Sequence, residues 1–264
     1  MANFIFWSDL HCEFRPFDLP DPSAFRARPD AVLLAGDTDL HPGHLETAGR
    51  IAKTYGCPVV ALSGNHEFYH RDYDTVRREE AEIAAQMRAD GIPVHVLNGT
   101  SVVIAGTRIV GATLWTDFEL NPAFGFLSRK IATRYMADYR VIGKSGRLLE
   151  PLDTIAMHLE EKAAIKDILA QPHDGPTVVM SHHLPCRELI GERYTGNDLN
   201  SAFASDLLRE FRDLAFDAWI FGHSHDNREL DVPGPGGKTQ RFLSNPRGYP
   251  DEETRFDPLR MLAL

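Results

Sequence analysis

The chain has 264 residues, of which 43% are hydrophobic and 25% are charged, and its formal net charge is −10. We expect no membrane span, because no segment approaches the roughly 20 continuous apolar residues that a span requires. The acidic balance disfavours long nucleic acid as a substrate, since binding to a polyphosphate backbone relies on positive charge.

The amino terminus and the cysteines carry expectations about location. The first residues run directly into a polar cluster and lack the pattern of a signal peptide, so we expect a cytoplasmic protein. Cys12, Cys57 and Cys186 are odd in number and widely spaced. This predicts reduced thiols, and neither a disulfide framework nor a CxxC metal pair.

Short apolar runs of strand length recur along the chain, and each one ends at a cluster of polar residues. Segments between the first three runs have helical character, which gives a β-α-β-α-β order typical of a parallel sheet. Open sheets of this kind bind ligands at the carboxyl ends of their strands. The predicted strands are 3–8, 31–35, 58–62, 177–180 and 218–221, and the predicted helices between them are 44–55 and 73–89.

The pattern changes after residue 94, where β-rich runs at 94–97, 101–105 and 107–113 are joined by hairpin signals. We expect a second, more antiparallel sheet to start there. The segment 117–146 has no clean period and is interpreted as a surface excursion or a lid within about 117–150. A helix over 152–169 and a last strand over 239–244 follow. No linker interrupts the chain, so we expect a single domain over 1–264.

The polar clusters together supply two carboxylates, one amide and up to six imidazoles, a set that suits two transition-metal ions. Residues i and i+2 of an extended segment point to the same side, so Asp9 and His11 can bind one ion together. A glycine precedes several of these residues and allows a tight turn with close backbone approach. Each motif alone is a common strand-end turn. The clusters are Asp9-Leu10-His11, Gly36-Asp37, Gly64-Asn65-His66-Glu67, Ser181-His182-His183 and Gly222-His223-Ser224-His225.

These five clusters, in this order, resemble the motifs of the calcineurin-like metallophosphoesterase superfamily. The family pattern is D-x-H, G-D-x-x-D/N, G-N-H-D/E, a separate His and G-H-x-H, and the match extends from Asp9 to His225. The resemblance implies an α/β fold, a four-layer α/β/β/α sandwich of two mixed sheets flanked by helices. The metal site would lie at the strand ends between the two halves.

The resemblance also implies two ligand sets that share Asp37 as a bridging carboxylate. A hydroxide or water that bridges two divalent ions would be the nucleophile. Mn²⁺, Fe²⁺/Fe³⁺ and Zn²⁺ all suit oxygen and nitrogen ligands without thiolate, and the spacing does not choose among them. One set would be Asp9, His11, Asp37 and His225, and the other would be Asp37, Asn65, His182 and His223.

By the same resemblance, His66 would face the substrate beside Asn65, where it would protonate the leaving oxygen or stabilise the transition state. The family commonly has an acidic or amide residue three positions after the G-D aspartate, where this chain has Leu40. Asp39 is therefore the substitute partner for His66, with a solvated loop carboxylate as the alternative. Glu67 is a candidate for orienting an imidazole.

Two further residues are candidates for contact with the substrate. His183 follows His182 in a strand-end loop, which places it at the rim of the site. Arg247 follows the last predicted strand, where its guanidinium could face a phosphate; a plain turn is the alternative.

The leading interpretation is a binuclear metal-dependent phosphoesterase that acts on a small phosphomonoester or phosphodiester. One alternative is a nuclease of the same superfamily, which the acidic charge disfavours. The other is a non-catalytic metal-binding interaction scaffold, which the presence of His66 in Gly64-Asn65-His66-Glu67 disfavours.

Overall fold

The β-α-β-α-β pattern of the first hundred residues forms one mixed sheet of the computed structural model, which describes all 264 residues. Its strand order is β13-β1-β2-β3-β4, in which β1 to β4 are parallel and β13 joins β1 antiparallel at the edge. The strands are β1 (Asn3–Trp7), β2 (Ala31–Ala35), β3 (Val59–Leu62), β4 (Val94–Val96) and β13 (Met261–Ala263).

The remaining strands form a second sheet in the order β11-β12-β10-β9-β6-β5. Its four central strands are parallel, and only the edge strands β5 and β11 are antiparallel. The prediction of a second sheet is confirmed, but this sheet is mainly parallel and starts at β5 rather than at residue 94, because β4 pairs with β3 in the first sheet. The strands are β5 (Thr100–Ile104), β6 (Thr107–Ala112), β9 (Thr177–Ser181), β10 (Ala218–Phe221), β11 (Glu229–Pro233) and β12 (Thr239–Ser244).

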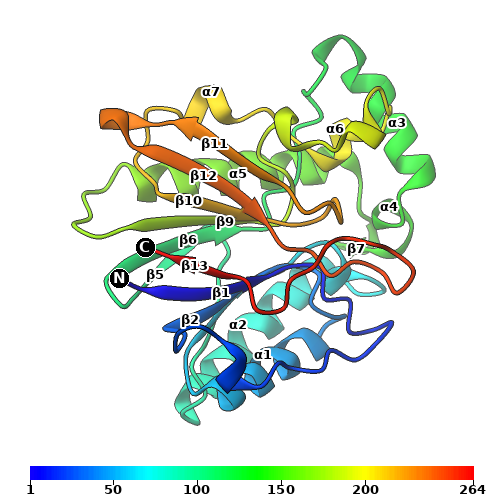
Figure 1. Cartoon of the computed structure of the whole chain (residues 1–264). Helices are drawn as coiled ribbons and strands as arrows, with labels where there is room; N and C mark the ends of the chain where they lie inside the picture. Colours follow the sequence, from blue (N-terminus) through cyan, green and yellow to red (C-terminus); the bar gives the residue numbers. More distant parts are fainter.

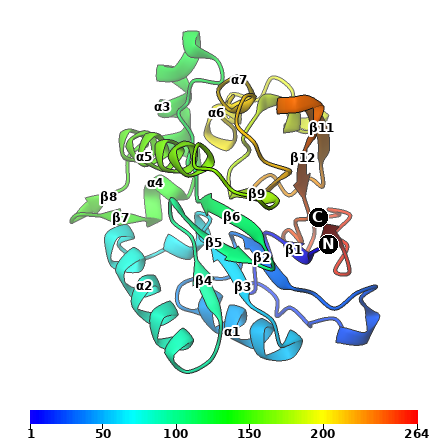
Figure 2. The ribbon, with the colours of Figure 1, turned by 90° about the vertical axis from the view of Figure 1, so that its left-hand side faces the viewer.

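The two sheets pack face to face, with helices on both outer faces (Figures 1 and 2). Helices α1 (Gly43–Tyr55) and α2 (Tyr73–Ala89) cover the first sheet, and α5 (Pro151–Leu169) and α7 (Leu208–Phe211) cover the second. Because successive strand residues point to opposite faces, Phe4 and Phe6 pack between the sheets while Ile5 and Trp7 pack against the helices. These layers confirm the predicted four-layer sandwich.

The segment predicted to be an excursion folds into short elements beside the carboxyl ends of the strands (Figure 1). Phe118, Ala132 and Ile142 from this segment pack with Phe68 and Trp115 in one buried cluster, so it is anchored to the body of the protein. Its elements are α3 (Gly125–Tyr135), α4 (Asp138–Val141) and the hairpin of β7 (Gly143–Lys144) with β8 (Arg147–Leu148).

One further α-helix, α6 (Asn200–Phe203), lies near α3 (Figure 1). Across the chain, no helix combines the length and the apolar character needed to cross a bilayer. The short 3-10 turns are Pro22–Ala24, His66–Phe68, Pro122–Phe124, Arg187–Leu189, Glu192–Tyr194 and Pro235–Gly237.

Candidate active site and metal centre

The five polar clusters meet at the carboxyl ends of β1, β2, β3, β9 and β10, and their backbone is unusual there. Positive φ is uncommon outside glycine and costs of order 1–3 kcal/mol per residue, so it persists only where the surrounding structure enforces it. Five of the seven predicted ligands have positive φ: Asp9 (51°), His11 (45°), Asp37 (52°), His223 (72°) and His225 (50°). The strand ends thus hold a strained arrangement that directs these side chains to one point.

Two glycines allow the clusters to approach one another. A Cβ atom on Gly64 would lie 2.2 Å from Oδ1 of Asp37 and 2.7 Å from Cε1 of His182. A Cβ atom on Gly222 would lie 2.6 Å from Oδ2 of Asp9. The prediction that small residues permit close backbone approach at these positions is confirmed.

The first group of candidate ligands gathers around His225. Its Nε2 atom lies 2.9 Å from Nε2 of His11 and 3.4 Å from Oδ1 of Asp9. The backbone N–H of His223 donates to the same Asp9 oxygen at 2.9 Å and fixes that carboxylate. Oδ2 of Asp37 lies 3.8 Å from Nε2 of His11. The four side chains that the sequence assigned to one ion therefore lie together.

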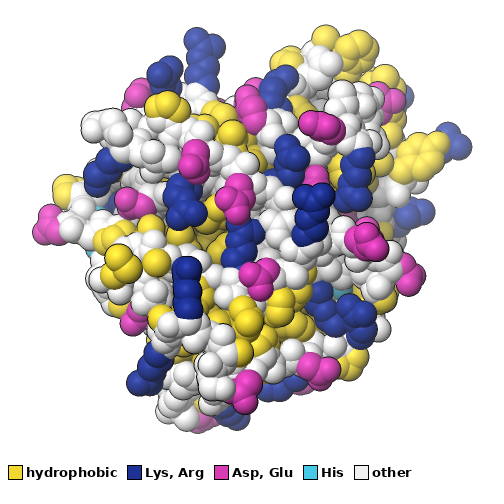
Figure 3. Space-filling model, in the orientation of Figure 1, with side chains coloured by type: hydrophobic (Ala, Val, Ile, Leu, Met, Phe, Trp, Pro, Cys, Tyr) yellow, Lys and Arg dark blue, Asp and Glu magenta, His cyan; other side chains and the backbone are white.

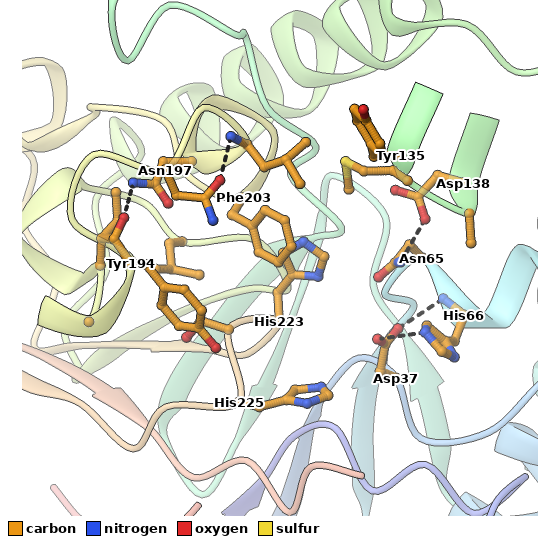
Figure 4. A pocket seen from close by; sticks show the side chains of 18 of the residues that line it. Asp37, Asn65, His66, Tyr135, Asp138, Tyr194, Asn197, Phe203, His223 and His225 are labelled. Carbon is orange, nitrogen blue, oxygen red and sulfur yellow. Dashed lines mark hydrogen bonds and ion pairs between the residues drawn. The ribbon is translucent and has the colours of Figure 1, made fainter. Parts of the chain in front are cut away.

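The second group gathers around Nε2 of His182. This atom lies 3.3 Å from Oδ2 of Asp37, 3.1 Å from Oδ1 of Asn65 and 3.2 Å from Nδ1 of His223. The backbone N–H of His66 donates to the other oxygen of Asp37 at 2.9 Å (Figure 4). Oδ2 of Asp37 thereby lies near nitrogen atoms of both groups, as a bridging carboxylate would.

The donor set fits a cation in each group. Nδ1 of His182 lies 2.9 Å from the carbonyl oxygen of Ala35, and Nδ1 of His225 lies 2.5 Å from Oε2 of Glu252. An imidazole that donates from Nδ1 presents an unprotonated Nε2, which is the form that binds metal. In addition, Oδ2 of Asp9 is buried and has no hydrogen-bond partner. Inward lone pairs beside buried carboxylates are what a divalent metal ion requires.

At one histidine of each group the electrostatics favour positive charge. Although burial opposes protonation, the neighbouring Asp37 raises the pKa of His182 to about 9. Burial is likewise outweighed at His225, whose pKa the carboxylates of Asp9 and Glu252 raise to about 10. Bound cations would satisfy the same carboxylates, and metal binding would then compete with protons for these imidazoles.

His66 lies at the edge of the centre, and its partner is Glu13. Nδ1 of His66 lies 2.8 Å from Oε1 of Glu13, while Nε2 lies 3.1 Å from the hydroxyl of Tyr249. Burial opposes protonation of His66, but Asp37 and Glu13 raise its pKa.

The prediction that Asp39 orients His66 is not matched by the geometry. The Asp39 carboxylate accepts a hydrogen bond from the backbone N–H of Leu40 at 2.7 Å, within its own loop. Glu13 occupies the position beside His66 because the loop after β1 brings it there, two residues beyond His11.

Glu67 and Arg247 both bind backbone groups. Glu67 accepts hydrogen bonds from the N–H groups of Asp37, Thr38 and Gly64 at 2.8 to 3.1 Å and so ties the turns after β2 and β3 together. Arg247 donates to carbonyl oxygens of the loop after β1, at Leu10, Arg15 and Pro16. The interpretation of Arg247 as a phosphate contact is replaced by a structural one, since its guanidinium is engaged by that loop.

His183 does not lie at the rim of the site. Its side chain is buried, and its ring packs 4.2 Å from the ring of His223 and 5.1 Å from that of Trp115. Burial and the neighbouring His182 lower the pKa of His183 to about 3, so it is neutral. His183 therefore packs against the candidate ligand His223 and supports its ring.

Several residues of the site were missed by the sequence interpretation. Asp138 accepts hydrogen bonds from Nδ2 of Asn65 at 2.9 Å and from the Tyr69 hydroxyl at 2.7 Å, which turns Oδ1 of Asn65 toward His182. No sequence signal links Asp138 to Asn65, because they are 73 residues apart. Glu13 carried no strand-pattern signal either, because it lies in a turn after His11 and not in an extended strand.

A cavity of about 380 Å³ opens beside the centre (Figure 4). It is lined by 21 residues, ten of which are hydrophobic, and they include Asp37, Asn65, His66, His223 and His225. Its size lies at the lower end of the range for small-molecule sites. The site can therefore admit a small molecule next to both groups of candidate ligands.

Two mixed sheets that bring buried carboxylates and histidines together at their strand ends define a metallohydrolase of the phosphoesterase type. The family model described as "Calcineurin-like phosphoesterase" matches residues 2–227, so the chain belongs to this family. The family is metal-dependent, and membership supports a hydrolase.

A solved structure shows the same fold. The phosphopantetheinyl hydrolase PptH from Mycobacterium tuberculosis is 18% identical, with a TM-score of 0.65 over 94% of this chain and 90% of that one. A dimetal phosphatase from Danio rerio is 14% identical, with a TM-score of 0.43 over 92% of this chain and 86% of that one. No curated protein matches the chain.

Proposed function

We propose that the protein is a binuclear metal-dependent phosphoesterase that hydrolyses a small phosphomonoester or phosphodiester. The observation that carries the proposal is the position of Asp37, whose Oδ2 atom lies 3.8 Å from His11 and 3.3 Å from His182. When bound, two divalent ions would lower the pKa of water toward neutrality and neutralise charge on phosphoryl oxygens. Mn²⁺, Fe²⁺/Fe³⁺ and Zn²⁺ suit this donor set.

The residues of the chain have distinct tasks in this proposal. Asp9, His11 and His225 would hold one ion with Asp37, and Asn65, His182 and His223 would hold the other. His66 would donate a proton from Nε2 to the leaving oxygen, with Glu13 fixing the ring through Nδ1. A general acid in this position contributes about 10²- to 10⁴-fold to the rate.

The alternatives receive less support from the surface and the site. Acidic and basic side chains intermix over the face drawn in Figure 3, without the continuous basic surface that a nuclease for long nucleic acid would use. The cavity beside His66 favours an enzyme over a metal-binding scaffold, since a scaffold needs no enclosed space for a substrate.

Metal analysis tests the shared carboxylate. We expect two ions per chain in wild type after loading with Mn²⁺, about one ion in Asp9→Ala and close to none in Asp37→Ala. His173→Ala, on the loop before β9, is the control and should keep both ions. One ion per chain in wild type, or equal loss in the two aspartate variants, would contradict the binuclear assignment.

Turnover tests the catalytic role of His66. With p-nitrophenyl phosphate and its bis ester, we expect metal-dependent hydrolysis that falls about 10²- to 10⁴-fold in His66→Ala while the metal content is retained. Absence of turnover by metal-loaded wild type on these esters and on a broader phosphate panel would favour the scaffold.

A further inference from the structure

The cavity beside the metal centre has two chemically different halves. One half is formed by the candidate ligands and His66. The other half is formed by the end of α3 and by the segment 184–203, which contribute side chains such as Tyr135, Asn197 and Phe203 (Figure 4). The side chains of this second half are largely apolar: Tyr135, Met136, Leu184, Ile190, Leu199 and Phe203.

The apolar half begins directly at the metal centre. The ring of Phe203 packs 4.4 Å from the ring of His223, a candidate ligand of the second ion. A phosphate held between the two ligand groups would therefore direct its attached organic group over Phe203. Burial of apolar surface there would favour a substrate whose first atoms beyond the phosphate are hydrocarbon.

No lysine or arginine lines the cavity, whereas Asp37, Asp138 and Glu252 do. Arg193, from the same segment as the apolar wall, donates to the carbonyl oxygen of His225 at 3.5 Å and stacks 4.7 Å over the ring of Tyr194. A second phosphate or carboxylate on the substrate would thus find no fixed cation in the cavity. Placing such a charge against an apolar wall without a partner is costly.

Two polar side-chain atoms of the wall are already engaged with backbone groups. Oδ1 of Asn197 accepts a hydrogen bond from the N–H of Leu199 at 2.9 Å, and Nδ2 of Asn200 donates to the carbonyl oxygen of Tyr194 at 2.8 Å. A sugar would lose hydrogen bonds to water on entering, and these two atoms are not free to replace them.

We propose that the substrate is a phosphate ester with an apolar arm and no second anionic group. This inference rests on the proposed phosphoesterase function and names the substrate class of the same site. The binding energy would be divided between the ions, which take the phosphate, and the wall from α3 and the segment 184–203, which takes the arm.

Two sources could supply such an ester, namely a water-soluble alkyl phosphate or a membrane lipid. Helix α3 carries Arg129, Lys130 and Arg134 and no acidic residue, and its Phe126 and Leu127 are 65% and 47% exposed. Apolar side chains project beside basic ones at the upper right of Figure 3, where Figure 1 places α3. An arm that leaves the cavity past Tyr135 would meet this helix.

The test measures kcat/KM of metal-loaded wild type for alkyl phosphates from ethyl to hexyl, and for the matching alkyl p-nitrophenyl phosphates. These are a monoester and a diester series, so the result does not depend on which ester the enzyme prefers. In the series that is hydrolysed, we expect a rise of about threefold to fourfold per methylene group, as burial of each one predicts. Phosphatidic acid in phosphatidylcholine vesicles is the lipid substrate of the test, and its turnover would identify a lipid source.

A matched pair of substrates tests the exclusion of charge. Hexyl phosphate and 6-(phosphonooxy)hexanoate differ mainly in a terminal carboxylate, and we expect the latter to have a kcat/KM at least about tenfold lower. The same comparison is made with the corresponding p-nitrophenyl diesters. In Leu199→Arg the penalty should shrink by about fivefold, because the variant supplies a partner for the carboxylate. Leu152→Arg, on the exposed face of α5, should leave the penalty unchanged.

The outcomes separate this inference from the function on which it rests. No turnover of any ester by metal-loaded wild type would overturn the phosphoesterase itself. Turnover with no dependence on chain length, or with preference for the carboxylate, would overturn the substrate class alone. The wild-type series stands independently if Leu199→Arg does not fold.

Discussion

One oxygen atom of Glu13 connects a candidate ligand with the candidate catalytic residue. Oε1 lies 2.9 Å from Nδ1 of His11 and 2.8 Å from Nδ1 of His66. Although burial opposes ionisation, these hydrogen bonds lower the pKa of Glu13 to about 2, so it is a carboxylate at neutral pH. Glu13 therefore fixes the orientation of both rings and takes the place that the sequence interpretation gave to Asp39.

Glu13→Gln tests this positioning role. The neutral amide oxygen of glutamine accepts hydrogen bonds from His11 and His66 less strongly than the carboxylate does. We therefore expect kcat to fall about 10- to 100-fold. Because Glu13 also orients the ring of His11, a candidate ligand, the metal affinity measured by titration with Mn²⁺ should weaken as well. A purely structural role would lower the thermal stability without changing either readout at a temperature where the variant is folded.

Asp39→Asn is the matched control for Glu13→Gln. Its side chain can still accept the hydrogen bond from Leu40, so kcat and metal affinity should stay within about twofold of wild type. A large loss in Asp39→Asn together with a neutral Glu13→Gln would reverse the assignment and restore Asp39 as the partner of His66.

At the scale of single elements, α5 is tied to the end of β6 by a buried carboxylate. Glu161 of α5 accepts a hydrogen bond from the backbone N–H of Leu114 at 2.7 Å, and its other oxygen lies 3.8 Å from Arg77. Burial raises the pKa of Glu161 from 4.5 to about 7. The folded protein therefore holds a proton on Glu161 at a pH where the unfolded chain has released it.

This raised pKa predicts a dependence of stability on pH. Between about pH 4.5 and pH 7 the native state binds more protons than the unfolded state, so the contribution of Glu161 to stability falls as the pH rises. Glu161→Gln lacks this loss. From pH 5 to pH 8 we expect its free energy of unfolding to increase relative to wild type by about 1 to 3 kcal/mol. Urea unfolding at both pH values measures the difference.

Glu160→Gln provides the control on the same helix. Glu160 is exposed, so its substitution should leave the pH dependence of unfolding unchanged. A constant difference between Glu161→Gln and wild type across this pH range would show that the carboxyl titrates at its ordinary pKa when folded.

At the scale of the whole molecule, the last strand of the chain forms an edge of the first sheet, beside the first strand. β13 pairs with β1, and Leu262 of β13 packs between the two sheets with Phe4 and Ile220. This central layer receives side chains from both sheets, so neither sheet can bury its inner face alone. As a physical consequence, we expect residues from both ends of the chain to unfold together in one cooperative unit.

Leu262→Ala tests how much the packing of β13 contributes to stability. Leu262 is 2% exposed, so its truncation leaves a cavity between the sheets, and we expect a loss of about 2 to 4 kcal/mol in the free energy of unfolding. Leu259→Ala, 38% exposed on the preceding loop, should cost less than about 1 kcal/mol. Equal effects in urea titrations of the two variants would contradict this contribution of β13 to the stability of the fold.

The single domain over 1–264 stays a prediction, and cooperativity tests it. We expect unfolding curves from far-ultraviolet circular dichroism and from tryptophan fluorescence to coincide, since Trp7 belongs to the first sheet and Trp219 to the second. Separated transitions would indicate two units. The cytoplasmic location likewise stays a prediction.

Much of the scaffold was predictable because its strands are short apolar runs with polar ends. The ranges for β2, β10 and α2 match the predictions residue for residue. β11 was missed, although Glu229 and Asp231 alternate with Leu230 and Val232 in the pattern of a half-exposed strand. β4 was assigned to the wrong sheet, because a strand of three residues carries no information about which neighbour it pairs with.

The sequence by itself determined the donor chemistry of the candidate ligands and their place at the ends of strands. Each polar cluster is contiguous with its strand, so local patterning suffices to identify it. Only the tertiary structure decided what surrounds those ligands: Glu13 beside His66, Arg247 turned to the backbone, His183 buried, and a wall without a cation. These neighbours come from distant parts of the chain, and their approach depends on how two sheets and their helices pack together.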